Sequence, residues 1–123
     1  MKKKALSVDD SPSVRKLVEF TLKSKGFQVA SAQDGQEALE LLAKEQFDVI
    51  ILDINMPRMD GLEFLQKMRP NDAYASIPVI VLTTEGLEAD RDRAMDLGAT
   101  AYIVKPFKPT QLLSLVDKML ATS

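Results

Sequence analysis

Polar side chains that could take part in chemistry follow four mostly apolar stretches of the chain. Each stretch is short, and each is followed by a carboxylate, a hydroxyl or an ammonium group instead of another apolar side chain. A charge at the end of a buried segment costs free energy unless a partner or a ligand compensates it. The groups are Asp9 and Asp10 after Ala5–Val8, Asp53 after Val49–Leu52, Thr83 after Ile77–Leu82, and Lys105 after Ala101–Val104.

The residue types in this set are those used in phosphoryl transfer. Three carboxylates brought close together repel one another strongly at low dielectric, and Lys105 can offset only one of their charges. A divalent cation would offset the rest. Carboxylates and a loop carbonyl suit Mg²⁺, which also binds phosphate oxygens, whereas Ca²⁺ needs more protein oxygens. With Mg²⁺, a lysine and a threonine hydroxyl nearby, an aspartate nucleophile would form an acyl phosphate.

Each of these residues also has an ordinary explanation when it is considered alone. Asp9 and Asp10 could simply favour the N-terminus of a following helix. Asp53 could only end a strand, since Asp is depleted in strands and common in turns. Thr83 or Lys105 alone would be unremarkable. It is the polar character of all four strand ends together that favours a functional site.

The composition excludes several classes of function. The chain has 123 residues, which suggests one domain, and its net charge of −2 gives no electrostatic basis for nucleic-acid binding. It has no Cys and no His, which excludes disulfides, thiol catalysis, a Ser-His-Asp triad and a typical zinc site. Because the chain shows neither a signal peptide nor an apolar stretch of membrane-spanning length, we expect a cytoplasmic protein.

The elements that must position these residues are predicted to alternate between strand and helix. We expect the four stretches above to be strands and Gln28–Ala32 to be a fifth, at an edge of the sheet. Cap signals predict the starts of five helices, and alternation of this kind predicts a parallel α/β sheet covered on both faces. The carboxyl ends of parallel strands share one edge, so the polar groups should converge there. The predicted helix starts are Ser11-Pro12, Asp34, Asp60, about Leu87, and Pro109.

The helix predicted from about Leu87 to Leu97 differs from the others. Its apolar face is thin, and charged residues crowd its surface. We therefore expect it to be the least firmly held helix and a candidate for movement.

The polar strand ends and the residues around them also carry a family resemblance. The chain resembles the receiver domain of two-component response regulators, and most closely the stand-alone, CheY-like type, over essentially its whole length. The resemblance implies one domain over residues 1–123 with a doubly wound, flavodoxin-like sheet of order 2-1-3-4-5. It also implies a cis peptide bond before Pro106. The motifs are Val8-Asp9-Asp10, Leu52-Asp53-Ile54-Asn55-Met56-Pro57 with Asp60-Gly61, Leu82-Thr83, and Lys105-Pro106-Phe107.

The resemblance implies a phosphoryl acceptor and its metal ligands. Asp53 corresponds to the acceptor. Asp10 and Asp53 would bind Mg²⁺ directly together with the backbone carbonyl of Asn55, and Asp9 would act through water.

The resemblance also implies a catalytic pair and a switch. Thr83 would hydrogen-bond one phosphoryl oxygen, and Lys105 would pair with another. When phosphate draws the Thr83 hydroxyl inward, the ring of Tyr102 would turn in. That movement would alter the surface formed by the fourth helix, the fifth strand and the last helix.

Three further positions are implied to tune turnover: Asn55, Thr84 and Glu85. Asn55 and Glu85 are similar to the residues of the rapidly reset chemotaxis type. Two positions depart from the family pattern: Thr84 stands where Ala or Gly is usual, and Ser7 stands where an apolar residue is common.

The implied function is that of a phosphorylation switch in a chemotaxis-like phosphorelay. The donor would be the phosphohistidine of a histidine kinase or phosphotransfer protein, because this chain has no His. The chain would be a monomer and not a dedicated enzyme, catalysing its own phosphorylation and dephosphorylation. It would signal to a downstream protein, with no nucleic acid and no membrane insertion involved.

Three alternatives belong to other classes of function. A phosphorylation-independent binding module would require a broken acidic pocket. A flavodoxin-like FMN carrier would require a Ser/Thr-rich loop after the first strand. An aspartate-dependent phosphatase would usually carry a second acid at the position of Asn55.

Overall fold

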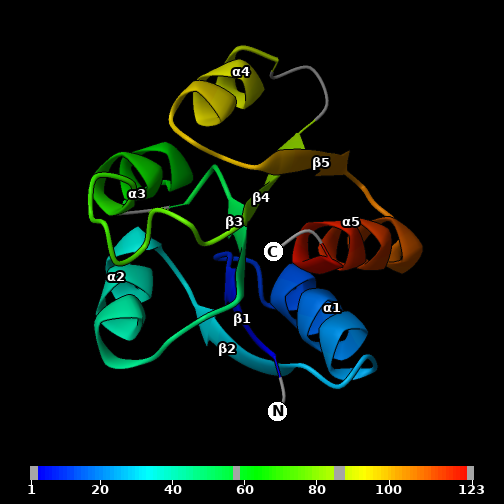
Figure 1. Cartoon of the computed structure of the whole chain (residues 1–123). Coiled ribbons are helices and arrows are strands. Elements are labelled where there is room, and N and C mark those ends of the chain that lie inside the picture. Colours follow the sequence, from blue (N-terminus) through cyan, green and yellow to red (C-terminus); the bar gives the residue numbers. More distant parts are fainter. Residues whose placement is uncertain (1–2, 57–58, 85–87, 122–123) are drawn as a thin grey trace.

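The computed structural model describes residues 3–56, 59–84 and 88–121, and across them the chain forms one parallel five-stranded sheet with helices between the strands. The strand order β2-β1-β3-β4-β5 confirms the predicted topology (Figure 1). The strands are β1 (Lys4–Val8), β2 (Gln28–Ala32), β3 (Val49–Asp53), β4 (Val79–Thr84) and β5 (Ala101–Lys105). The helices are α1 (Pro12–Lys23), α2 (Gly35–Lys44), α3 (Gly61–Met68), α4 (Glu88–Asp96) and α5 (Pro109–Ala121).

The helices cover both faces of the sheet, as a buried parallel sheet requires. Figure 1 shows α1 and α5 on one face and α2, α3 and α4 on the other. The central strand β3 is buried along its whole length, and its side chains alternate between the two apolar cores. Ile50 and Leu52 pack towards α2 and α3, while Val49 and Ile51 pack towards α1 and α5. Among the helices of the described residues, none combines the length and apolar character needed to cross a bilayer.

Three of the helices begin at the caps that the sequence predicts. The side chain of Ser11 accepts a hydrogen bond from the backbone N–H three residues later, at 3.4 Å, and so caps α1. Asp34 and Asp60 cap α2 and α3 in the same way, each at 2.9 Å. Each cap satisfies one of the free N–H groups at a helix start and fixes where the loop from the preceding strand ends.

The prediction for the fourth strand is wrong at its start. Strand β4 begins at Val79 and not at Ile77, because the N–H of Ile77 donates to the Tyr74 carbonyl (3.2 Å) and Pro78 has no N–H to donate. At its other end β4 ends in Thr83 and Thr84, as predicted, and both residues pair with residues of β5. The predicted start of the fourth helix at Leu87 lies outside the described residues, and α4 begins at Glu88 within them.

Arg69, at the end of α3, ties together two loops that precede strands. Its Nε and Nη2 donate to the Gly98 carbonyl, at 2.9 and 2.7 Å, beside the turn into β5. Its Nη1 donates to the carbonyls of Tyr74 (3.1 Å) and Ile77 (2.9 Å) before β4. Burial lowers the pKa of this guanidinium. Gly98 has φ +106°, a conformation that suits glycine, and Arg69 packs against it.

Replacing Arg69 by methionine is expected to destabilise the fold by about 3 kcal/mol, because hydrogen bonds from a charged donor to several carbonyls are lost together. Methionine keeps an unbranched apolar side chain, so the change mainly removes the donors. The matched control is Lys67→Met on the same helix, where an exposed ammonium lies 3.9 Å from Glu63. Urea unfolding of both variants measures the difference, and equal losses of stability would contradict the role given to Arg69.

Candidate functional site

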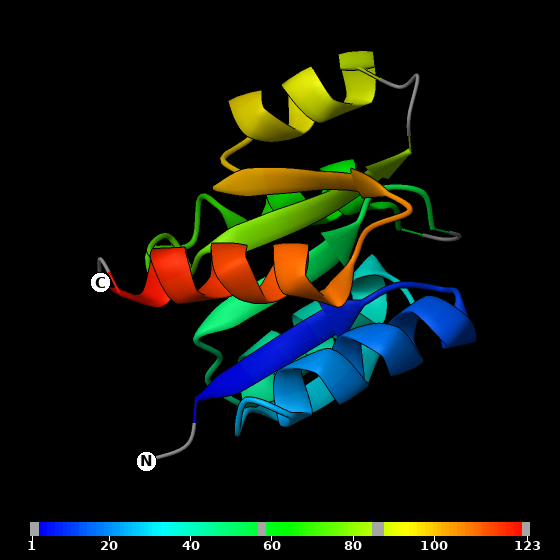
Figure 2. The same cartoon turned by 90° about the vertical axis from the view of Figure 1, so that its right-hand side faces the viewer.

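The carboxyl ends of the strands lie at one edge of the sheet. Figure 2 shows the strands pointing the same way, with the N- and C-terminal ends of the chain at the opposite edge. Asp9 follows β1 directly, Asp53 is the last residue of β3, and Lys105 is the last residue of β5. Thr83 is the penultimate residue of β4. The convergence expected from a parallel sheet is therefore present.

Three carboxylates meet at this edge. Asp9, Asp10 and Asp53 each offer an oxygen within 4.8 Å of the others. Asp9 and Asp53 are buried, with exposed fractions of 1% and 5%, while Asp10 is exposed. The Nζ of Lys105 lies 3.1 Å from Asp53 Oδ1 and 3.5 Å from Asp9 Oδ2. A single ammonium group thus faces both buried carboxylates, and Asp10 closes the cluster on the solvent side.

The electrostatics of the cluster follow from this geometry. Burial, followed by the nearby Asp9 carboxylate, raises the pKa of Asp53 to about 6, although Lys105 opposes the shift. For Lys105, burial acts to lower the pKa, but the Asp53 and Asp9 carboxylates outweigh it and the pKa is raised overall. The site therefore carries an excess of negative charge that one lysine does not neutralise.

Hydrogen bonds hold the backbone N–H, the carboxylate and the backbone carbonyl of Asp9. Its backbone N–H donates to the Ala32 carbonyl (3.0 Å), and its Oδ1 accepts from the Ser11 N–H (2.9 Å). Its own carbonyl accepts from Nη1 of Arg15 at 2.7 Å. The sequence pattern does not point to Arg15 as part of the site. The available signal was a basic residue one helical turn after the Ser11 cap, which is a weak signal by itself.

The backbone of Asp53 and Ile54 packs against Gly61, the first residue of α3. The Gly61 N–H donates to the Ile54 carbonyl at 2.8 Å. A Cβ atom at Gly61 would lie 2.4 Å from the Asp53 carbonyl oxygen and 2.8 Å from the Ile54 Cα. Only glycine permits this approach. Asn55 is exposed in the loop that follows β3, and Pro57 lies outside the described residues.

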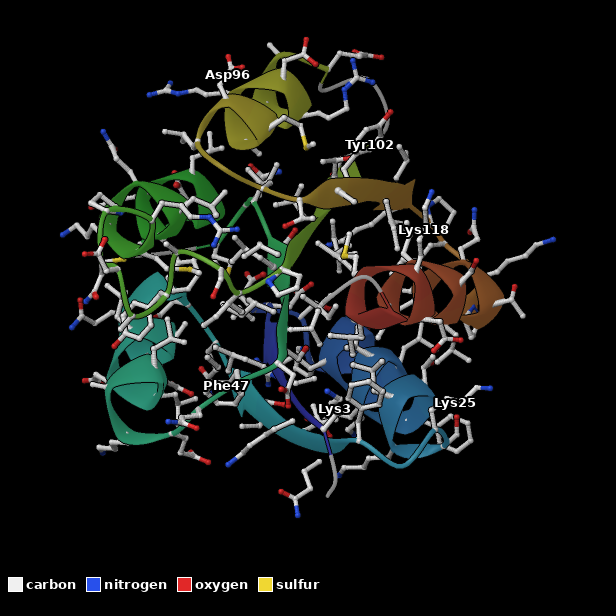
Figure 3. All side chains as sticks on the ribbon, viewed as in Figure 1. Lys3, Lys25, Phe47, Asp96, Tyr102 and Lys118 are labelled. Carbon is white, nitrogen blue, oxygen red and sulfur yellow. The ribbon has the colours of Figure 1, made fainter. Side chains whose placement is uncertain are left out.

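Thr83 and Tyr102, the expected switch pair, lie on neighbouring strands. Thr83 is 3% exposed, and its hydroxyl donates to the Ile103 carbonyl at 3.4 Å, next to Tyr102 in β5. Tyr102 is 41% exposed and lies beside α4 (Figure 3). The guanidinium of Arg91 on α4 lies 5.1 Å from its ring centroid. The Tyr102 ring is thus directed outward in this structure.

Two other sequence expectations concern the rim of the site. The Lys105-Pro106 peptide bond is cis, as expected. Of the residues expected to tune turnover, Asn55 and Thr84 are exposed, and Glu85 lies outside the described residues.

The chain has a parallel α/β sheet with an acidic cluster and a lysine at its carboxyl edge. Comparison with known sequences identifies the class of protein that has this arrangement. The family model of the response regulator receiver domain matches residues 5–117. The chain therefore belongs to the response regulator receiver domain family.

Two kinds of known protein are similar to this chain in sequence. A chemotaxis protein CheY homolog of Campylobacter jejuni is 42% identical over 121 residues, covering 97% of this chain and 93% of that protein. A probable transcriptional regulator, ycf27 of Guillardia theta, is 44% identical over 119 residues, covering 97% of this chain but 46% of that protein. The chain thus spans about half the length of the ycf27 and ycf29 regulators that it matches.

Solved structures agree with this assignment. The chemotaxis response regulator CheY4 of Vibrio cholerae superposes with a TM-score of 0.91 at 42% identity, over 98% of this chain and 100% of that one. The receiver domain of sensor histidine kinase PA1611 from Pseudomonas aeruginosa, which has a magnesium ion in its active site cleft, gives a TM-score of 0.90 at 27% identity, over 98% of this chain and 99% of that one. The protein is thus a CheY-like receiver domain of the two-component type.

Proposed function

We propose that Asp53 is the phosphoryl acceptor of a Mg²⁺-dependent signalling switch. The observation that carries this proposal is the meeting of the Asp9, Asp10 and Asp53 carboxylates with Lys105. A phosphorylation-independent module would not need to maintain such a concentration of charge. With its pKa raised to about 6, the Asp53 carboxylate is ionised at neutral pH and can act as a nucleophile.

The donor set of this cluster fits Mg²⁺. Carboxylate oxygens are hard ligands, and those of the cluster are close enough together to share one ion. We assign direct coordination to Asp10, Asp53 and the backbone carbonyl of Asn55, with Asp9 acting through water. The PA1611 receiver domain, with magnesium in its active site cleft, supports a magnesium site in this chain. When bound, the metal would neutralise charge on the phosphoryl group.

The residues of the chain then have separate roles in the transfer. An Asp53 carboxylate oxygen attacks phosphorus while the bond from phosphorus to the donor's histidine nitrogen breaks. Lys105, already 3.1 Å from Asp53, pairs with one phosphoryl oxygen, and the Thr83 hydroxyl donates to another. The donor is the phosphohistidine of a kinase or phosphotransfer protein. The chain is not a dedicated enzyme, since it acts only on its own aspartate.

Hydrolysis of the acyl phosphate by the same site would make the signal self-limiting. Asn55, Thr84 and Glu85 would tune this autodephosphorylation. Asn55 and Thr84 are both exposed and would be accessible to water and to a partner. Because Thr84 carries a larger side chain than the usual Ala or Gly, its bulk would restrict that access.

The output of the switch is assigned to the surface of α4, β5 and α5. On phosphorylation, the Thr83 hydroxyl would leave the Ile103 carbonyl for the phosphoryl group, and the Tyr102 ring would turn inward from its exposed position. Helix α4 would follow, since Ala94 is its one fully buried residue among those described. The CheY homologue and CheY4 favour a chemotaxis-like output. We propose that the chain acts as a monomer in the cytoplasm, through contact with a downstream protein.

Incubation with acetyl phosphate tests the proposed function directly. In the presence of Mg²⁺, the intact mass of the protein should increase by one phosphoryl group, and EDTA should prevent the increase. If the mass stays unchanged while Mg²⁺ is demonstrably bound, Asp53 is not a phosphoryl acceptor and the proposal fails.

Millimolar Mg²⁺ is expected to raise the melting temperature of the protein. An ion that binds only the folded state stabilises it by about 2.7 kcal/mol at a hundred times its dissociation constant. The measurement is a thermal melt at low ionic strength, with NaCl of equal ionic strength as the control. Asp10→Asn should reduce the shift because it removes one direct ligand. If Mg²⁺ leaves the melting temperature unchanged, the cluster binds no cation.

A further inference from the structure

Arg15 reaches the acidic site through the backbone of Asp9. It lies in the first turn of α1, half-buried, and its Nη1 donates to the Asp9 carbonyl at 2.7 Å. Its backbone N–H donates to the Ser11 carbonyl at 3.0 Å. The Ser11 N–H in turn donates to Asp9 Oδ1 at 2.9 Å. Asp9, Ser11 and Arg15 are therefore joined in a closed ring of hydrogen bonds.

The hydrogen bond from Arg15 restrains the orientation of the peptide that connects Asp9 to Asp10, just after strand β1. The carbonyl oxygen of Asp9 belongs to the rigid peptide plane that joins Asp9 to Asp10. Strand β1 ends at Val8, and the backbone N–H of Asp9 makes its bond to Ala32, the last residue of β2. Beyond this point strand pairing no longer holds the chain, and the guanidinium of Arg15 holds the peptide plane instead.

Asp10 depends on this restraint more than the other two acids do. Asp9 is buried and held by Ser11 and Lys105, and Asp53 is buried at the end of β3 and held by Lys105. Asp10 is exposed, yet its carboxylate comes within 4.8 Å of the other two. The orientation of its backbone is what keeps it in the cluster.

We propose that Arg15 is a positioning residue for the cation site, which it serves by fixing the Asp9–Asp10 peptide so that Asp10 faces Asp53. The proposal rests on the proposed function, in which Asp10 is a direct ligand. Groups that orient metal ligands typically contribute 10- to 100-fold to metal affinity. Removing the Arg15 donor should therefore weaken Mg²⁺ binding by about that factor.

The charge of Arg15 acts in the opposite direction. A guanidinium bonded to the Asp9 carbonyl repels Mg²⁺, so its removal should slightly tighten binding if charge were its only contribution, and this effect should fade with added salt. A positioning role therefore predicts weaker Mg²⁺ binding when the guanidinium is removed, and a purely electrostatic role predicts tighter binding. The sign of the change distinguishes the two.

The test is isothermal titration of the 123-residue chain with MgCl₂, without any phosphoryl donor. Arg15→Met keeps the apolar stem and removes the donors. Lys16→Met is the matched control, because it removes an exposed cation from the next position of the same helix. We expect about 10- to 100-fold weaker binding for Arg15→Met at both low and high salt, and unchanged or slightly tighter binding for Lys16→Met. Arg15→Lys, which retains one donor group, should lie between the wild type and Arg15→Met.

The outcomes separate this inference from the function on which it rests. If the wild type binds no Mg²⁺, the proposed function itself fails. If the wild type binds Mg²⁺ and Arg15→Met binds it equally well or better, the positioning role is wrong while the proposed function stands. Circular dichroism in EDTA establishes that each variant folds. Should Arg15→Met not fold, Arg15→Lys decides the matter, and wild-type affinity in that variant overturns the inference.

Discussion

Replacing Asp53 by asparagine is expected to abolish phosphorylation and, at neutral pH without metal, to make the protein more stable. The pKa of Asp53 is raised from 3.8 to about 6 in the folded state, chiefly by burial and then by Asp9. The folded protein therefore holds this proton more tightly than the unfolded chain does. The stabilisation from Asp53 is fully present below about pH 3.8 and is lost as the pH rises through about 6.

The size of this effect follows from the shift in pKa. At about 1.4 kcal/mol for each unit, an ionised Asp53 costs the metal-free protein about 3 kcal/mol above pH 6. Asparagine has nearly the same shape and carries no charge, so Asp53→Asn should remove most of this cost. The variant also lacks the nucleophile, and its mass should not change with acetyl phosphate and Mg²⁺.

Urea unfolding in EDTA at pH 5 and at pH 7.5 measures the effect on stability. The advantage of Asp53→Asn over the wild type should be larger at the higher pH. Asp117→Asn, an exposed acid on α5, serves as the control and should show no such pH dependence. A variant that is less stable than the wild type at pH 7.5, or that still gains a phosphoryl group, would contradict the assignment of Asp53.

Gly61→Ala is expected to destabilise the fold and to disrupt the acidic site together. The added Cβ would lie 2.4 Å from the Asp53 carbonyl oxygen and 2.8 Å from the Ile54 Cα, and neither backbone atom can move without displacing the end of β3. Overpacking of this kind costs about 3 kcal/mol. Because Asp53 moves with that backbone, the rise in melting temperature caused by Mg²⁺ should also be lost.

Gly26→Ala is the matched control for this prediction. Gly26 has φ +87° after α1, and a Cβ there would meet nothing within 4 Å. The substitution should cost about 1–2 kcal/mol through its backbone conformation alone and leave the Mg²⁺ response intact. Thermal melts with and without Mg²⁺ compare the two variants. A normal Mg²⁺ response in Gly61→Ala would mean that the end of β3 does not set the geometry of the site.

The topology and the convergence of polar residues could be predicted from the sequence because both follow from local patterns. Apolar runs and cap residues mark the elements, and a parallel sheet places the carboxyl ends of its strands at one edge. Asp9, Asp10, Asp53 and Lys105 meet for this reason. The resemblance to the receiver family added the strand order and the cis bond before Pro106, both of which the structure has.

The features that the sequence did not predict depend on contacts between distant side chains and the backbone. The start of β4 was predicted two residues early, because an apolar run does not reveal that Tyr74 holds the Ile77 N–H or that Arg69 holds its carbonyl. The link from Arg15 to Asp9 is of the same kind.

A crystal structure of the protein with bound Mg²⁺ would show whether Asp10 and Asp53 hold the ion together. We expect one ion at the carboxyl edge of the sheet, bonded at about 2.0–2.1 Å to carboxylate oxygens of Asp10 and Asp53 and to the backbone carbonyl of Asn55, with waters in the remaining positions of an octahedron. An ion bound elsewhere on the surface, with Asp10 turned away from Asp53, would contradict it.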